Sequence, residues 1–229
     1  MSGGRPGPEP PPLPAVEGFG QLHLWLIDLD AGSEAEDWLL LDEAEQSRAR
    51  RFVFAHDRRR YVAAHAALRR LLSACTAQPP NLLRFRTGEF GKPFLVGLPA
   101  CFFNLSHSQG AGLIGISSTA EIGVDVEILR SIPDADALSR DNFSSAEQAA
   151  LSSAQGPSRD LRFLSGWTRK EACLKAVGSG LSIHPATFEV GLEPETREVA
   201  IQSEAGLLGL RVGSFRHGTA ILGALAQRL

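Results

Sequence analysis

Lysine is scarce in this chain. The sequence holds 23 lysine and arginine residues, and only three of them are lysines, Lys92, Lys170 and Lys175. A chain that otherwise uses arginine for its positive charge has placed two of its three lysines in one short stretch. Because a lysine ammonium is a compact point charge that suits a phosphate oxygen, this placement indicates an anion-binding site there.

Cysteine and long apolar runs are also scarce. The three cysteines, Cys75, Cys101 and Cys173, are widely spaced and match no zinc-ligand pattern. We expect reduced core thiols of a cytoplasmic protein, not a disulfide framework. No apolar run reaches the roughly 18 residues that a membrane helix needs, and the beginning of the sequence shows no signal pattern. We therefore expect no membrane association.

Neither positive nor negative charge is in large excess. The formal net charge is -3 over 229 residues, and the isoelectric point is about 6.1. This balance argues against general nucleic-acid binding. With 43% hydrophobic and 21% charged residues, the composition is that of a globular protein long enough for one large domain or two small ones.

The stretch from Trp167 to Leu181, WTRKEACLKAVGSGL, carries the scarce lysines. Its apolar residues recur at helical spacing and form one stripe, together with Lys170. Glu171 and Lys175 stand one turn apart on the neighbouring flank. We expect this flank to border the core and face a cleft, where a carboxylate could bind a metal and the ammonium a phosphate.

Two simpler interpretations of this stretch exist. Thr168 and Glu171 fit a capping box at a helix start, and Glu171 with Lys175 fits an exposed ion pair worth about 0.3–0.5 kcal/mol. The apolar pattern already begins at Leu161, however. Thr168 is therefore expected in the middle of a helix. This position argues against the capping box and favours a helix flank that faces a cleft.

The second motif is GVDVE, Gly123 to Glu127. In a strand, Asp125 and Glu127 point to one face and lie roughly 6–7 Å apart along it, since side chains alternate. Two carboxylates on one face repel each other unless a cation lies between them, and Mg²⁺ prefers oxygen ligands. The alternative is an exposed strand edge on which both carboxylates face water.

The rest of the chain suggests two similar halves behind a tail. Residues 1–18 contain six prolines, Pro6, Pro8, Pro10, Pro11, Pro12 and Pro14, and we expect a disordered tail. We expect an N-terminal α/β half over residues 19–118 and a C-terminal α/β half over residues 119–229. The expected elements include a strand over Gln21–Asp28, a helix over Glu34–Ser47, a long helix over Asp57–Cys75 and a strand over Phe102–Leu105 that ends in a Ser-His-Ser loop.

Together the motifs carry a family resemblance. FNLSHS (residues 103–108), GVDVE and WTRKEACLKAVGSGL, in this order, resemble the Sfp-type 4′-phosphopantetheinyl transferases, and so do GKP (Gly91 to Pro93) and the run Arg48 to Phe52. The resemblance implies that family's fold, two similar α/β subdomains with pseudo-two-fold symmetry, in a monomer. It implies an enzyme of the holo-[acyl-carrier-protein] synthase type. Such an enzyme moves the phosphopantetheine arm of coenzyme A (CoA) to a serine of an apo acyl- or peptidyl-carrier protein, requires Mg²⁺ and releases adenosine 3′,5′-bisphosphate.

The resemblance also implies site residues. The metal ligands would be Asp125, Glu127 and Glu171, with Glu171 as the general base as well, and Lys175 would meet the CoA phosphates. The CoA-binding positions are Arg48, Arg60, Lys92, Asn104, Ser106, His107, Asp125 and Lys175, and Ser106 and His107 match a loop that contacts the 3′-phosphate. The chain departs from the family at Glu45, where a lysine is common. Lys170 matches the motif, but it lies on the apolar stripe and is a candidate for a structural role.

Two other functions are compatible with these residues. A Mg²⁺-dependent hydrolase of CoA-like pyrophosphates could use the same carboxylates with water as the nucleophile. A non-catalytic nucleotide-binding module is a further alternative, against which the presence of all three carboxylates and Lys175 argues. The sequence does not identify the carrier protein, which could serve polyketide or nonribosomal peptide biosynthesis, or fatty-acid synthesis.

Overall fold

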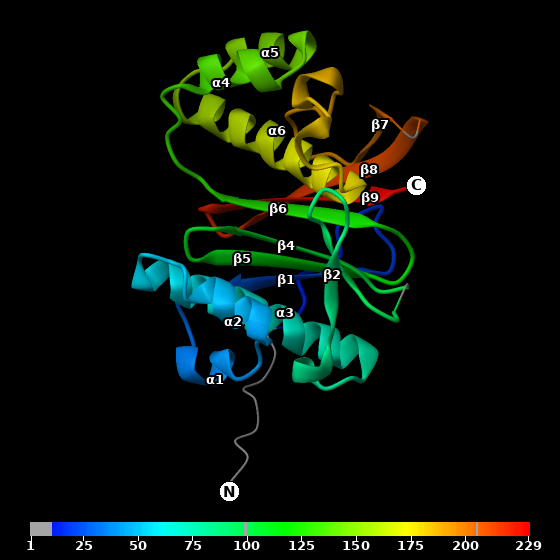
Figure 1. Ribbon diagram of the computed structural model, residues 1–229. Coiled ribbons are helices and arrows are strands. Elements are labelled where there is room, and N and C mark those ends of the chain that lie inside the picture. Colours follow the sequence, from blue (N-terminus) through cyan, green and yellow to red (C-terminus); the bar gives the residue numbers. More distant parts are fainter. Residues whose placement is uncertain (1–10, 99, 205) are drawn as a thin grey trace, which may run out of the picture.

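Two antiparallel sheets, each with its own helices, make up most of the protein. The computed structural model describes residues 11–98, 100–204 and 206–229. Figure 1 shows the order of the layers: helices α1 to α3, the sheet of β1, β5 and β4, the sheet of β6 to β9, and helices α4 to α6. This arrangement confirms the predicted α/β class with two similar subdomains.

The two sheets have simple neighbour orders. The first has the order β1-β5-β4, built from β1 (Leu22–Asp28), β4 (Phe102–Ser108) and β5 (Ala111–Ser117). The second has the order β6-β9-β8-β7, built from β6 (Ile122–Ile128), β7 (Arg197–Ser203), β8 (Gly206–His217) and β9 (Ile221–Arg228). A separate two-stranded ribbon is formed by β2 (Phe85–Thr87) and β3 (Pro93–Leu95).

The helices fall into two groups that cover opposite outer faces. The first sheet carries α1 (Glu34–Trp38), α2 (Glu43–Ala49) and α3 (Ala55–Thr76). The second sheet carries α4 (Ala135–Asn142), α5 (Ser145–Ser152) and α6 (Gly156–Val177). Short 3₁₀ turns lie at Pro80–Leu82, Gly180–Ser182 and Pro185–Thr187.

The alternation of side chains along the strands explains why the sheets stack. On β5, Leu113 points toward the second sheet and packs with Val124 and Val126 of β6. Its neighbours Ile114 and Ile116 point the other way, into the cluster under α3. Strand β5 is therefore buried on both faces, which matches its continuous apolar sequence.

The prediction of a single helix over Glu34–Ser47 is wrong. The structure has two short helices, α1 and α2, and Leu39 between them is 75% exposed. Asp42 begins the second helix with a capping box, since its carboxylate accepts from Glu45 N at 2.9 Å and Glu45 Oε2 accepts from Asp42 N at 3.0 Å. A cap at this position starts a new helix and ends the continuous pattern.

Part of the predicted tail lies against the protein. Leu13 N donates to Leu24 O at 2.7 Å, and Glu17 O accepts from Thr196 Oγ1 at 2.9 Å. Residues 11–18 therefore lie against the protein, on β1 and on the segment that leads into β7, and the first ten residues of the expected tail lie outside the described ones. Cys101 and Cys173 are free thiols. No helix among the described residues has the length and apolar character needed to cross a membrane.

Candidate active site between the two halves

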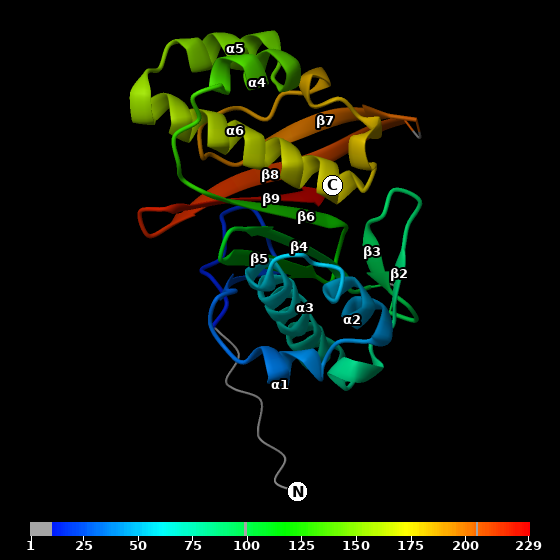
Figure 2. The ribbon, with the colours of Figure 1, turned by 60° about the vertical axis from the view of Figure 1, so that its left-hand side comes forward.

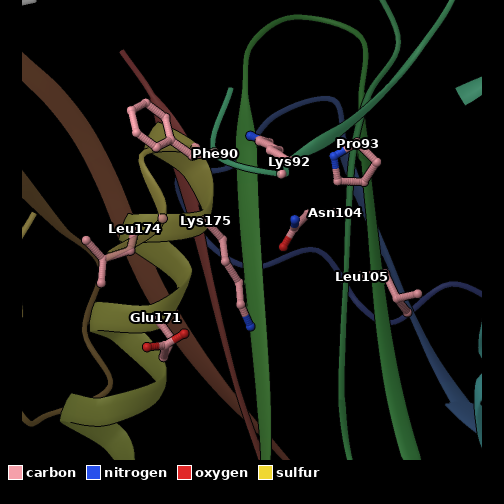
Figure 3. Close-up of a pocket in the computed structure, with 11 residues that line it drawn as sticks. Phe90, Lys92, Pro93, Asn104, Leu105, Glu171, Leu174 and Lys175 are labelled. Carbon is pink, nitrogen blue, oxygen red and sulfur yellow. The ribbon is translucent and has the colours of Figure 1, made fainter. Parts of the chain in front are cut away.

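A pocket of about 310 Å³ opens where the β2–β3 ribbon and strand β4 face helix α6. Figure 3 shows the side chains around it, with Glu171 and Lys175 on α6 and Asn104 on β4. Its lining residues are Phe90, Gly91, Lys92, Pro93, Asn104, Leu105, Glu171, Leu174, Lys175, Gly178 and Gly180. Both charged residues of the expected helix flank therefore line this pocket.

Gly123 allows α6 to lie directly on β6. A Cβ added at this glycine would stand 2.0 Å from Ala172 O and 2.3 Å from Ala176 N. Any side chain would push the helix away, so the glycine of GVDVE sets the depth of α6. Gly123, Asp125 and Glu127 share one face of the strand, and the close approach brings Asp125 beside Lys175.

Asp125 is 6% exposed and bound by two donors. Lys175 Nζ lies 2.6 Å from Asp125 Oδ1, and Ser106 Oγ donates to the same oxygen at 2.8 Å. Lys175 Nζ also donates to Ser106 Oγ at 3.1 Å. Burial raises the pKa of the Asp125 carboxyl, and the Lys175 ammonium opposes that shift. The three side chains form one polar cluster drawn from β4, β6 and α6.

Polar side chains of β4 join the two sheets. Asn104 Oδ1 accepts from Val124 N at 2.8 Å, and Ser108 Oγ donates to Glu127 Oε2 at 2.7 Å. The prediction of a loop at Ser106–Ser108 is wrong. Strand β4 continues to Ser108, and all three residues pair with β5. Its alternate residues Asn104, Ser106 and Ser108 therefore all turn toward β6.

Glu171 is the one carboxyl group among the residues that line the pocket. Among the described residues it makes no hydrogen bond or ion pair within contact distance, although Lys175 stands one turn away. Burial raises the pKa of its carboxyl, Asp125 and Glu127 add to the rise, and Lys175 opposes it. The three carboxyl groups therefore form one acidic cluster whose charges repel one another.

The expected metal ligands do not surround a common point here. Within residues 11–98, 100–204 and 206–229, no group of three His, Cys, Asp or Glu side chains is arranged to hold a metal ion. Basic side chains neutralise two of the three carboxylates instead. Lys175 binds Asp125, and Arg130 donates to Glu127 Oε2 at 2.7 Å. Their oxygen chemistry still suits a hard cation.

His107 lies on the opposite face of β4 from Ser106. His107 is exposed as a whole residue. Partial burial of its ring nevertheless lowers the pKa of the imidazole, and the positive charge of Lys175 lowers it further. Its neighbourhood includes His65 and Asp57 of α3, which act on its pKa in opposite directions. The histidine and the serine of the motif therefore face different sides of the sheet.

Two expected arginines lie near α3 with other partners. Arg60 binds the exposed Asp30 through two hydrogen bonds of 2.8 and 2.7 Å. This pairing lowers the pKa of Asp30 to about 2. Arg48 stacks its guanidinium over the ring of Tyr61, 5.7 Å from the ring centre. Neither arginine lines the pocket beside Glu171.

Lys92 and Lys170 are bound within the protein. Lys92 Nζ contacts Glu121, Ile122 O and Ala176 O. Lys170 is 0% exposed, and its ammonium binds Glu147 Oε2 at 2.8 Å and two backbone carbonyls. These contacts support a structural role for Lys170, which its place on the apolar stripe had suggested.

Sequence reasoning missed Glu147, which organises the back of α6. Its Oε2 accepts from Ser144 N and Lys170, and its Oε1 accepts from Val190 N at 2.8 Å. The signal that the sequence carries here is the S-x-x-E pattern of Ser144 and Glu147, which predicts a capping box, as the structure has it, but no buried ion pair. Through Lys170, the same carboxylate holds the helix that carries Glu171.

Two family models match the chain. One, described as 4′-phosphopantetheinyl transferase superfamily, matches residues 121–216. The other, described as 4′-phosphopantetheinyl transferase, N-terminal, matches residues 34–119. The two matches fall on the two halves and include every residue of the polar cluster.

Curated relatives agree with these matches. The 4′-phosphopantetheinyl transferase HetI of Nostoc sp. is 36% identical over 192 residues, which cover 82% of this chain and 80% of that protein. A putative 4′-phosphopantetheinyl transferase of Synechocystis sp. is 37% identical over 164 residues, 71% of this chain and 67% of that protein. The 4′-phosphopantetheinyl transferase Sfp of Bacillus subtilis is 29% identical over 151 residues, 66% of each chain. This protein therefore belongs to the 4′-phosphopantetheinyl transferase superfamily and is an enzyme of that type.

Proposed function

We propose that the enzyme transfers the 4′-phosphopantetheine arm of CoA to a serine of an apo acyl- or peptidyl-carrier protein. The observation that carries this proposal is the polar cluster itself. Lys175 binds Asp125 and Ser106 across the junction of the halves, with Glu171 in the same pocket. A lysine ammonium beside acidic groups suits a pyrophosphate whose charge grows during transfer.

The reaction requires one bond to form and one to break. The carrier serine Oγ bonds to the phosphorus that bears the pantetheine. The bond from that phosphorus to the bridging oxygen breaks, and adenosine 3′,5′-bisphosphate leaves with that oxygen and its electron pair. Glu171 is our candidate for the base that accepts the serine proton, because its carboxyl faces the pocket and its raised pKa strengthens it as a base. Lys175 would bind the phosphate oxygens that gain charge.

We also propose a magnesium requirement. Asp125, Glu127 and Glu171 supply carboxylate oxygens from one acidic cluster, which is the donor chemistry that Mg²⁺ prefers. When bound, the ion would neutralise charge on the pyrophosphate. Asp125 and Glu127 would then exchange their present partners, Lys175 and Arg130, and Lys175 would become free to bind phosphate.

The remaining CoA contacts are proposals of the same kind. Asn104 lines the pocket, and Ser106 and His107 follow it on β4, so this strand is a candidate for the nucleotide end of CoA. Arg60 would have to exchange Asp30 for a phosphate oxygen, and Arg48 would contribute charge from α2. We further propose that the protein works as a monomer in the cytoplasm.

The direct test is intact-mass spectrometry of an apo carrier protein incubated with the enzyme, CoA and Mg²⁺, with an EDTA control. We expect the carrier to gain the mass of one phosphopantetheine arm, and we expect EDTA to prevent it. The matched variant is Glu171→Gln, which keeps the size of the side chain but removes the proposed base. Wild-type turnover by this variant would remove Glu171 from the mechanism.

A second assay distinguishes hydrolysis from transfer. CoA is incubated with the enzyme and Mg²⁺ without any carrier, and adenosine 3′,5′-bisphosphate is followed by chromatography. We expect no release without the carrier. Release at the same rate with and without the carrier would favour the pyrophosphate hydrolase.

A further inference from the structure

Lys92 extends from the β2–β3 ribbon into the junction of the two halves. It closes the loop between these strands, since Gly88 N donates to Lys92 O at 2.8 Å. Figure 2 shows the ribbon standing apart from the first sheet, beside the ends of α6 and β6. In Figure 3 the Lys92 side chain points from the ribbon toward β6.

The ammonium of Lys92 has used its hydrogen-bonding capacity. A protonated lysine has three N–H donors and no acceptor. Lys92 Nζ has three oxygen partners, namely the Glu121 carboxylate, Ile122 O at 2.9 Å and Ala176 O at 3.2 Å. The side chain is 15% exposed. While these bonds persist, no donor remains for a phosphate oxygen.

Two of the partners lie at the closest contact between α6 and β6. Ala176 is in the last turn of α6, where carbonyl groups lack a helical partner and the helix dipole is negative. Ile122 is the first residue of β6. Next to Ile122, Gly123 leaves no room for a Cβ against the backbone of Ala172 and Ala176. Lys92 thus binds the backbone on both sides of this contact.

The stem of Lys92 packs over the end of the helix. Gly178 ends α6 with a φ of +73° and donates its N–H to Leu174 O at 2.9 Å. A Cβ at Gly178 would stand 3.0 Å from Lys92 Cδ. The glycine therefore serves both the left-handed cap and the close packing of the lysine stem.

We propose that Lys92 is a positioning residue that latches the β2–β3 ribbon to the α6–β6 junction and so fixes Glu171 and Lys175. It does not bind a phosphate of CoA, although the sequence resemblance places it among phosphate-binding positions. This inference refines the proposed function and rests on it for the role of the pocket. The latch itself is a property of the protein without a substrate.

Thermal unfolding without CoA provides the first test. Lys92→Met keeps an apolar stem of similar length and removes the ammonium with its three donors. We expect the melting temperature to fall by roughly 2–8 °C, because carbonyls and a carboxylate lose their partner. Glu121→Gln should lower it less, and the double variant should lower it by less than the sum. Glu89→Gln, an exposed carboxylate on the same ribbon, is the matched control and should change nothing.

Donor kinetics separate the latch from a phosphate contact. CoA and 3′-dephospho-CoA are compared as donors for wild type, Lys92→Met and Glu121→Gln. For a latch, Lys92→Met lowers kcat with both donors and leaves the ratio of their kcat/KM values as it is in wild type. If Lys92 contacted the 3′-phosphate, Lys92→Met would instead lower kcat/KM for CoA relative to that for 3′-dephospho-CoA, by roughly 10-fold or more.

Two results would overturn the latch. One is an unchanged melting temperature of Lys92→Met without CoA. The other is a lower KM for CoA in Glu121→Gln, since removing a competing carboxylate would free a phosphate-binding ammonium. If no transferase activity were found in any variant, the melting experiment would still decide the role of Lys92, and only the proposed function would fail.

Discussion

Lys175 Nζ lies 2.6 Å from Asp125 Oδ1, so the lysine of α6 neutralises the first carboxylate of GVDVE across the sheet–helix contact. The Lys175 side chain is 29% exposed and that of Asp125 is 8% exposed. The pair is therefore partly shielded from water, and its loss should be felt both in stability and at the site.

Lys175→Met should destabilise the protein by about 1–3 kcal/mol at neutral pH, because it leaves Asp125 buried without its counter-charge. Urea unfolding measures this change. The double variant with Asp125→Asn removes the orphaned charge and should regain part of the loss. If the double variant were less stable than Lys175→Met alone, the ion pair would not be the cause.

Glu171→Gln should change how stability depends on pH. The folded-state pKa of Glu171 is raised, so its neutral form favours folding, and that contribution is lost as pH rises through the folded-state pKa. The glutamine variant does not titrate. With EDTA present, the melting temperature of Glu171→Gln minus that of wild type should therefore increase from pH 4 to pH 8, within the approximate range in which carboxyl groups titrate. A constant difference would show that the carboxyl keeps its ordinary pKa.

Gly123→Ala tests the contact that sets the depth of α6. The new Cβ would overlap Ala172 O, so α6 must shift, at a cost of about 1–3 kcal/mol. We expect a lower melting temperature and a loss of transfer activity that exceeds the loss of folded protein. Gly20→Ala is the control, since a Cβ there meets nothing within 4 Å. Equal effects of the two substitutions would contradict the close-packing argument.

The buried pair behind α6 gives a further prediction. Lys170→Met leaves the Glu147 carboxylate buried, and removing one partner of a buried pair typically destabilises by about 3–5 kcal/mol. Adding Glu147→Gln should recover part of this loss. Guanidinium unfolding of the two single variants and the double variant measures the coupling. Independent, additive effects would mean that the two side chains do not act as a pair.

The strong sequence patterns predicted the elements that build the site. The four- and three-residue spacing on α6 placed Glu171 and Lys175 on one flank, and both residues line the pocket. The mid-helix position expected for Thr168 is confirmed, because its hydroxyl donates to Leu164 O within the helix. Period and spacing sufficed here because a single helix determines the relation of these residues.

Relations between distant segments were not visible in the sequence. The helix expected over Glu34–Ser47 failed because the apolar pattern continues through Leu39 while Asp42 caps a new helix. The three partners of Lys92 are 29, 30 and 84 residues away in the chain, and no local pattern encodes them. Glu45 stands where the family often has lysine, and it binds the buried Arg69 at 2.7 Å.

The proposed magnesium ligands give the last prediction. Asp125→Asn and Glu127→Gln each keep the shape of the side chain and remove one negative charge from the acidic cluster. We expect each variant to weaken Mg²⁺-dependent CoA binding, measured by calorimetry, by at least roughly 10-fold. Without Mg²⁺ each variant should bind CoA at least as tightly as wild type, because one negative charge near the phosphates is removed.

Arg130→Met is the matched variant for this experiment. Arg130 binds Glu127 Oε2 at 2.7 Å and is itself 44% exposed. Because the proposed ion must displace this guanidinium, Arg130→Met should leave Mg²⁺-dependent binding equal to wild type or tighten it. If Arg130→Met weakened binding as much as Glu127→Gln, the ion pair would be part of the CoA site, and Glu127 would not be a metal ligand.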